Sequence, residues 1–393
     1  MSKSGVDQMV QEFLDQHPVD SADDRTLRGA RFDAGLAFPH FEFGLGGRNL
    51  KPSTYREVED LFLAAGAADF ADRNIIGLGM AAPTLHAHGT AAQKALLRPL
   101  FTGEHIWCQL FSEPDAGSDL ASLSTRAQAD GAGWIVNGQK MWTTLAHEAR
   151  WGLLLARSDP DLVKHAGLTY FILDMQAQGV EVRPLRQMTG EAEFNECYLT
   201  DVLLSSNDVV GQPGGGWSIA MTTLANERMS LGAFRGPSGS RPIDVAMRTY
   251  REAMECHRTI PAHRSRLLEL WVRAEVGDLS NRRAQERAKS ALGPEGSVNK
   301  LAMAELNKAV FELVVDLAGA EGMLIDNYDE IRPTVTSVHG TGDPRKAFLR
   351  TRANSIEGGT SEIMRTILGE RILGLPPEPR ADRGVPWNQT LRT

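Results

Sequence analysis

Cysteine is scarce in this sequence. Cys108, Cys197 and Cys256 are the only three among 393 residues, and they lie far apart in the chain. Their spacing matches no metal-binding or redox motif, so the sequence predicts no disulfide framework and fits a reducing compartment.

An excess of positive charge is also lacking. Lysine and arginine number 42 against 50 aspartates and glutamates, which gives a formal net charge of −8. This balance argues against nucleic acid as a main partner and against a basic membrane-binding face. No apolar run reaches the roughly 18 residues of a membrane span, and the N-terminal residues lack the apolar core of a signal peptide. We therefore expect a cytoplasmic, globular protein without a membrane partner.

The pattern of apolar residues changes twice along the chain. The first hundred residues show helical spacing, with a cap at Thr90 and Gln93, apart from a stretch at 20–50 that we expect to be a packed loop. Short β-rich runs separated by Gly, Asp and Pro then occupy 124–204 and predict an antiparallel β-domain. From Trp217 the helical period returns. The chain is long enough for two to three domains, and an α+β fold follows.

The changes of pattern predict the domain boundaries. We expect an N-terminal helical domain at 1–105, a middle β-domain at 106–213 and a C-terminal helical bundle at 214–375. The proline-rich run at 376–379 is expected to end ordered packing, which leaves 376–393 as a polar tail.

Two stretches in the predicted β-domain carry chemistry. Leu110 to Asp119 reads Leu-Phe-Ser-Glu-Pro-Asp-Ala-Gly-Ser-Asp, a strand that breaks at Pro114 and Gly117. Proline fixes φ and glycine permits positive φ, so the backbone can turn sharply and approach a ligand. Free N–H groups and hydroxyls at such a turn suit a polar, anionic or heteroaromatic cofactor.

The second stretch is Asn137-Gly138-Gln139-Lys140-Met141-Trp142-Thr143-Thr144. Its Asn-Gly step predicts a hairpin turn, and a strand with an aromatic ring and two hydroxyls follows. Together the two stretches resemble the acyl-CoA dehydrogenase family, whose middle domain carries an "S-E-P-x-A-G-S-D" turn and an "N-G-x-K-x-W-x-T" strand. The resemblance covers nearly the whole chain, and it implies a helical domain, a β-barrel or sandwich domain and a four-helix bundle.

The resemblance also implies a reaction. Family members desaturate an acyl-CoA thioester: a carboxylate takes the Cα proton while a hydride leaves Cβ for N5 of flavin adenine dinucleotide, FAD. The Cα proton is weakly acidic, so the thioester carbonyl must be polarised. By resemblance, Trp142 covers a flavin face, Thr144 bonds near N5, and Ser118 also touches the acyl-CoA. The implied flavin contacts are Gln109, Leu110, Phe111, Ser112, Gly117, Ser118, Trp142, Thr143 and Thr144. Without the neighbouring turn, a core aromatic would be the simpler reading of Trp142.

The position of the base departs from most of the family. The usual "Y-E-G-T-x-E-I" stretch reads Ile356-Glu357-Gly358-Gly359-Thr360-Ser361-Glu362-Ile363, so the usual base position holds Gly358. Glu357 falls one place early and points in a different direction, and we do not expect it to be the base.

A subgroup of the family, by resemblance, keeps its base on the first helix of the C-terminal domain, in an "x-E-R" step. Glu227 stands there, between Asn226 and Arg228. A carboxylate against its mild helix face would have a raised pKa through desolvation, as a base near neutral pH needs. An ion pair with Arg228 or a solvated glutamate are the alternatives. Asn226, Arg228 and Gly358 would then contact the substrate, the last through its N–H; alternatively, Arg228 only packs the helix.

Two further stretches concern cofactor and assembly. Thr360 and Glu362 open a helix that family members place beside the adenine dinucleotide, although Thr360 could equally be only a helix cap. The family's "R-x-x-F-G" stretch is reduced here to Arg258, and its "Q-x-x-G-G-x-G" stretch reads Asp316 to Gly322 with changes. Whether Arg258 contacts the flavin diphosphate stays open. These changes put the usual homotetramer in doubt.

The main hypothesis is a FAD-dependent acyl-CoA dehydrogenase with Glu227 as base, which passes electrons to an electron-transfer flavoprotein. It would form a homo-oligomer, as a dimer or tetramer, or a heteromer with a paralogous chain. One alternative is a non-catalytic subunit of a heteromeric dehydrogenase, and another is a flavin oxidase or monooxygenase. Linear, branched, aromatic and steroid side-chain acyl groups all remain open. His86 and His88 match no metal-ligand spacing, so no metal site is predicted.

Overall fold

The computed structural model describes residues 3–232, 241–287, 295–325, 329, 331–336, 342–379 and 382–390. The chain divides into two compact units, which are described separately. The first comprises Met1–Leu185, Phe194–Asn226 and Asp382–Thr393, and the second comprises Arg186–Glu193 and Glu227–Ala381.

The first unit begins with helices, whose bounds are α1 Lys3–Gln16, α2 Asp24–Asp33, α3 Thr54–Ala64, α4 Ala82–His88, α5 Ala91–Lys94 and α6 Leu97–Thr102. Of these, α1, α2 and α3 contribute to an apolar cluster that includes Val10, Phe13, Val58 and Phe62, while α6 packs against α2. The predicted cap at Thr90 is confirmed, because its side chain and that of Gln93 form a reciprocal capping box.

Helix α2 lies inside the stretch that we predicted to be a loop. Asp23 caps it by accepting from the N–H groups of Arg25 and Thr26. The prediction was wrong because α2 is rich in charged residues: the helix is amphipathic, with Leu27 and Phe32 buried, but the low overall hydrophobicity of the segment hid this period.

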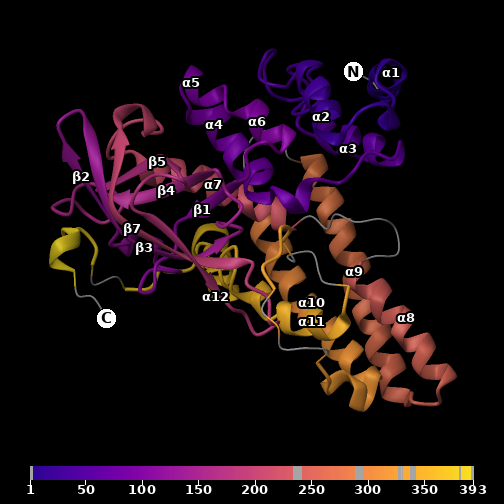
Figure 1. The fold of residues 1–393 in the computed structure, drawn as a ribbon. Helices are drawn as coiled ribbons and strands as arrows, with labels where there is room; N and C mark the ends of the chain where they lie inside the picture. The colour runs from indigo at the N-terminus through magenta and orange to yellow at the C-terminus, as the bar shows by residue number, and fades with distance from the viewer. Residues whose placement is uncertain are drawn as a thin grey trace. The chain divides into compact units, whose positions relative to one another are not determined.

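Within the described residues, seven strands of the first unit form one sheet in the order β1-β4-β2-β3-β7-β6, with β5 paired to β4 (Figure 1). The strands are β1 Trp107–Leu110, β2 Arg126–Asp130, β3 Gly133–Thr144, β4 Trp151–Arg157, β5 Leu168–Asp174, β6 Val180–Leu185 and β7 Phe194–Ser205. Pairing is mostly antiparallel, but β1 and β2 each pair with β4 in parallel. The sheet is therefore mixed and not wholly antiparallel as predicted. The alternation of apolar and polar residues identifies a strand, but it does not show in which direction the neighbouring strand runs.

The predicted hairpin turn at Asn137-Gly138 is wrong. Both residues lie inside β3, where the pairing with β7 shifts register between Val136 and Gly138. The Asn137 side chain bonds across this bulge to Asp201, which has a φ of 51°. The chain reverses earlier, at Gly131, where φ is +57°. Pairing with a neighbouring strand has overridden the local turn preference of Asn-Gly.

The second unit is helical. Helix α7, Gly216–Gly232, crosses the division between the units, which falls between Asn226 and Glu227. Helix α10 packs against α8, α9, α11 and α12, and the long α9 and α10 lie side by side (Figure 1). The bounds are α8 Pro242–Glu255, α9 Pro261–Arg287, α10 Glu295–Ala318, α11 Pro344–Arg350 and α12 Ser361–Ile367. This helical unit and the mixed sheet confirm the predicted α+β class. None of the helices in the described ranges is long and apolar enough to cross a membrane.

The chain returns to the first unit after Pro379, where we had expected ordered packing to end. Trp387 is only 7% exposed, and its Nε1 donates to the carbonyl of Ser122 at 3.2 Å. The Arg157 guanidinium lies 4.7 Å from the centre of the indole ring. Residues 382–390 thus form an ordered segment against the β-domain, held by the indole ring of Trp387. The prediction relied on the polar composition of the segment and overlooked this single large aromatic residue.

Candidate functional site

The turn after β1 is closed by its own backbone. The N–H of Glu113 donates to the carbonyl of Ala116 at 3.1 Å, and the N–H of Ala116 donates back at 3.2 Å, so Pro114 and Asp115 form the tip. Gly117 does not supply the positive φ that we expected, because the fixed φ of Pro114 already sets the turn. A Cβ at Gly117 would meet no heavy atom within 4 Å beyond its chain neighbours, so the space there is open.

The side chains of this turn divide between core and surface. Leu110 and Phe111 are buried and can offer a ligand only their backbone. Gln109 and Ser112 are half-buried and Ser118 is exposed. Backbone groups and two hydroxyls therefore remain for a polar, planar ligand at this surface.

Trp142 on β3 has a strained backbone and an exposed ring. Its φ is 59°, at a register shift between Lys140 and Thr143, and the residue is 53% exposed. The indole meets the edge of the Phe194 ring at 5.9 Å. Thr143 is fully buried, whereas Thr144 is half-buried. The bulge thus turns the indole outward, where its free face can stack on a planar group.

A buried ion pair joins the turn to β3. Lys140 is fully buried, and its Nζ donates to Glu113 Oε1 at 2.8 Å, to the Phe111 carbonyl at 3.0 Å and to the Leu155 carbonyl at 2.8 Å. The N–H of Met141 also donates to the Ser112 carbonyl at 2.9 Å. The two stretches singled out in the sequence are therefore neighbours in space.

Glu113 carries its charge in this buried place. Burial opposes its ionisation, but Lys140 and the N–H groups of Ser124 and Thr125, at 2.6 and 2.9 Å, hold the pKa of Glu113 below its ordinary value. Sequence reasoning quoted Glu113 and Lys140 within the two motifs without giving them a role. The signal was weak, since the first stretch holds three acids, Glu113, Asp115 and Asp119, and nothing in the sequence marked Glu113 as the buried one.

The chain just beyond the turn is held from several sides. Asp119 accepts from Lys164 Nζ at 2.9 Å, and Lys164 also pairs with Asp382 of the returning segment. Arg157, which is 1% exposed, donates to the carbonyls of Ala121 and Leu123. These contacts hold the backbone that follows the turn in place. None of them was predicted from the sequence.

Helix α7 carries the predicted base and its neighbours. Asn226 Nδ2 donates to the carbonyl of Thr222 at 2.8 Å, one turn back on the same helix. Glu227 is half-buried. The side chain of Arg228 lies outside the described residues.

The loop before α12 needs its two glycines. Gly358 has a φ of 62° and Gly359 a φ of 92°, conformations that other residues adopt only with strain. Glu357 accepts from Arg350 at 3.1 and 2.9 Å and from Asn354 at 2.7 Å. Glu357 is therefore held in this ion pair, and that it is not the base stays a prediction.

Thr360 is the N-cap of α12, because its hydroxyl accepts from the N–H of Ile363 at 3.0 Å. Glu362 follows in the first turn, exposed, with an ion pair to Arg365 at 3.2 Å. Both predicted cofactor contacts are thus accessible parts of one helix start, and the cap itself is confirmed.

Lys300 on α10 is the principal residue that sequence reasoning missed. The residue is fully buried, and its Nζ donates to the carbonyl of Gly359. Burial lowers the pKa of Lys300, and the charges of four carboxylates oppose that shift: Glu357, Glu227, Glu305 and Glu362. Its helical spacing from the buried Ser297 and Ala304 could have placed it on the inward face.

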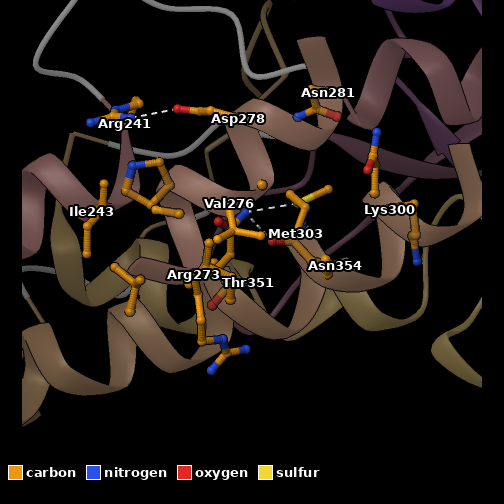
Figure 2. A pocket seen from close by; sticks show the side chains of 18 of the residues that line it. Arg241, Ile243, Arg273, Val276, Asp278, Asn281, Lys300, Met303, Thr351 and Asn354 are labelled. Carbon is orange, nitrogen blue, oxygen red and sulfur yellow. Dashed lines mark hydrogen bonds and ion pairs between the residues drawn. The ribbon is translucent and has the colours of Figure 1, made fainter. Parts of the chain in front are cut away.

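A cavity of about 410 Å³ lies beside Lys300 among α8, α9, α10 and the α11 region. In Figure 2 Val276 and Met303 lie at its middle, and Arg241, paired with Asp278, lies toward one end and Lys300 toward the other. Its lining also includes Arg273, Asn281, Asn299, Leu306, Phe311, Thr351, Asn354 and Glu357.

Other residues weighed in the sequence have structural partners. Arg258 donates to the carbonyl of Ala318, at the end of α10, at 3.1 Å. His86 lies 2.6 Å from Glu42 and stacks on Phe41.

Comparison with known proteins places both regions within one family. Residues 108–202 match the family model "Acyl-CoA dehydrogenase, middle domain", and residues 214–373 match "Acyl-CoA dehydrogenase, C-terminal domain". The first match contains the turn and β3, and the second contains Glu227, Lys300 and the Gly358–Gly359 loop.

Individual proteins agree with the family models. The chain is 40% identical to acyl-CoA dehydrogenase FadE34 of Mycobacterium tuberculosis over 88% of its own length, but spans only 45% of that protein. It is 35% identical to acyl-CoA dehydrogenase IpdE1 of the same organism, over 85% of this chain and 83% of the relative. The solved ChsE4–ChsE5 complex from that organism superimposes with a TM-score of 0.71 at 25% identity, covering 96% of this chain and 98% of the other. The chain belongs to the acyl-CoA dehydrogenase family of FAD-dependent enzymes.

Proposed function

We propose that this protein desaturates an acyl-CoA thioester between Cα and Cβ, with Glu227 as the base that removes the Cα proton. One observation carries this assignment: the charge of Glu227 acts on Lys300, and Lys300 donates to the carbonyl of Gly359, next to Gly358. One buried lysine is therefore coupled to the proposed base through charge and to the loop that carries Gly358 through a hydrogen bond. A base and a group that polarises the thioester must both reach the same Cα–carbonyl unit.

The first unit offers a surface that fits a flavin ring. The exposed indole of Trp142 suits one ring face, the hydroxyls of Ser112, Ser118 and Thr144 suit its polar edge, and the space at Gly117 is open. A flavin bound there would supply the acceptor for the hydride that leaves Cβ. Because the side chain of Thr143 is buried, we assign it only a backbone contact. We keep Gln109, Leu110 and Phe111 as backbone contacts and Thr360 and Glu362 as contacts of the adenine dinucleotide.

The substrate contacts follow from the same assignment. Gly358 binds the thioester carbonyl through its N–H, while Asn226 and Arg228 contact the CoA portion. The acyl group is left open, although the steroid side-chain class gains support from a similar solved structure named a steroid ACAD. Electrons pass to an electron-transfer flavoprotein. Pairing with a paralogous chain is supported by the ChsE4–ChsE5 complex, whose name records two different chains.

The test replaces the carboxylate while keeping its shape. Wild-type protein is expected to lose visible flavin absorbance when acyl-CoA is added without oxygen. Glu227→Gln is expected to keep its flavin but bleach ~10²–10⁴-fold more slowly, the usual contribution of a general base. Glu269→Gln, the same change at an exposed site on α9, is the control and should bleach like wild type. Bleaching by Glu227→Gln at the wild-type rate would refute the assignment, and rapid peroxide formation by wild type would favour an oxidase.

A non-catalytic subunit is the second candidate function. The bond of Arg258 to Ala318 favours it, because this arginine, the counterpart of the family residue at a flavin diphosphate, serves its own chain here. Protein purified alone would then carry no flavin, and addition of a paralogous chain would restore binding. Flavin retained by the chain on its own would exclude this reading.

A further inference from the structure

Lys300 is a charged side chain in a place that usually excludes charge. It is fully buried, and lysine is almost never so without a specific partner. Its Nζ donates to the Gly359 carbonyl, and carboxylates from several elements act on its charge: Glu227 from α7, Glu305 from α10, Glu357 from the loop and Glu362 from α12. A lysine needed only for packing would not require four carboxylates whose charges act on it.

The bond to Gly359 completes a clamp on the loop. Before the glycines, Glu357 is held by Arg350 and Asn354. After them, the hydroxyl of Thr360 fixes the start of α12. Two consecutive glycines have the greatest backbone freedom of any pair, so their N–H groups need an anchor at the pair itself. Lys300 supplies that anchor from a different helix.

We infer that Lys300 is a positioning residue for the dehydrogenation: its hydrogen bond to Gly359 aims the Gly358 N–H at the thioester carbonyl. This inference rests on the function proposed above. Coupling between two charges acts equally on both, so a carboxylate that favours the protonated lysine is itself favoured in its ionised form. The charges of Glu305, Glu357 and Glu362 also act on Lys300, and Arg350 and Arg365 pair with the last two.

The main experiment compares Lys300→Met with Lys300→Arg and with wild type. Methionine keeps the length of the side chain without its charge or its donor. We expect Lys300→Met to keep flavin and to lower the rate constant of flavin bleaching ~10-fold or more at neutral pH, with a smaller change in KM. The acid limb of its pH profile should move upward by roughly one pH unit, because the base has lost a nearby positive charge. Lys300→Arg should restore the acid limb, although its planar fork fits the Gly359 carbonyl less well.

A binding measurement tests the aim of Gly358 without turnover. Calorimetry compares an enoyl-CoA thioester with an alkyl-CoA thioether, which lacks the carbonyl oxygen. Wild type should bind the thioester ~10-fold more tightly, and Lys300→Met should lose most of that preference. Lys346→Met is the matched control, since this lysine lies in the same unit and pairs with Glu191 at 3.8 Å; it should keep both the pH profile and the preference.

The outcomes separate the inference from the function beneath it. If wild type bleaches but Lys300→Met keeps the wild-type pH profile and thioester preference, Lys300 is not a positioning residue, whatever its effect on stability. If none of the acyl-CoA thioesters bleaches the flavin of the wild-type protein, the proposed function fails. The inference then fails with it, because there is no thioester to position. A shifted acid limb restored by Lys300→Arg supports the inference.

Discussion

The two regions that bear the predicted site are both built around a buried lysine, but the two lysines differ in their partners. Lys140 in the β-domain donates hydrogen bonds to three acceptors: one carboxylate and two carbonyls. Lys300 in the bundle donates to one carbonyl, and four carboxylates act on it through their charge. The first arrangement fixes a surface, whereas the second leaves a charge that can tune a neighbouring acid. The comparison separates the structural role of Lys140, in the region proposed to bind the flavin, from the role in the reaction that we infer for Lys300.

The largest expected effect would break the β-domain arrangement. Lys140→Met should lower the free energy of unfolding by about 3–5 kcal/mol, because it leaves the charge of Glu113 buried without its partner. Flavin should be lost as the turn separates from β3. Urea unfolding followed by tryptophan fluorescence measures this, since Trp271 is the one tryptophan of the second unit and the rest report on the first.

The double variant Lys140→Met with Glu113→Gln separates the pair from its packing. It should recover part of the lost stability, because no unpaired charge remains. Lys51→Met, at an exposed lysine, is the control. A loss below about 1 kcal/mol in Lys140→Met would give the pair no more weight than a surface ion pair and would remove the contrast between the two lysines.

The stability of the first unit should depend on pH through His40. Burial and the nearby His86 lower the pKa of His40 from 6.5 to about 4, and its Nδ1 is buried without a hydrogen-bond partner in the described structure. The unfolded chain therefore takes up this proton first as the pH falls. Stability from neutral His40 is complete above about pH 6.5 and is lost between 6.5 and about 4, by up to about 3 kcal/mol.

Replacing His40 by glutamine should flatten this part of the stability–pH curve. Chemical unfolding at a series of pH values, read by the tryptophans of the first unit, gives the curve. His17→Gln, at an exposed histidine, should keep the wild-type slope. An unchanged slope in His40→Gln would assign the acid loss to other groups.

The smallest expected effect on stability belongs to the reacting region. Gly358→Ala should cost about 1–2 kcal/mol, because φ is +62° there and a Cβ disfavours that conformation. Gly296→Ala, at a helical glycine with open space around it, should be neutral or slightly stabilising. The bleaching rate of Gly358→Ala should fall by more than its stability suggests, since relieving the strain turns the N–H away. Wild-type bleaching in a destabilised Gly358→Ala would contradict the role given to this N–H.

The sequence predicted the parts of the site that are local and missed those that depend on packing. The turn and β3 could be found because each is one continuous stretch with its own chemistry. The Asn137-Gly138 step misled because β7 offers hydrogen bonds that hold it within a strand. Lys300 was overlooked because a single lysine on a helix usually marks a solvated face, and its partner, the carbonyl of Gly359, lies far along the sequence. Glu227 was proposed only through the resemblance, and its role still awaits the bleaching test.

The returning segment has a consequence for the order in which the protein is made. Trp387 meets Ser122 across 265 positions of sequence, and Asp382 shares Lys164 with Asp119. At the ribosome's pace of about 5–20 residues per second, the turn that we propose binds the flavin waits roughly 10 to 50 seconds for these supports. The nascent β-domain must therefore persist without them while the bundle is translated, and under the proposed function firm retention of the cofactor would be a late event of biosynthesis.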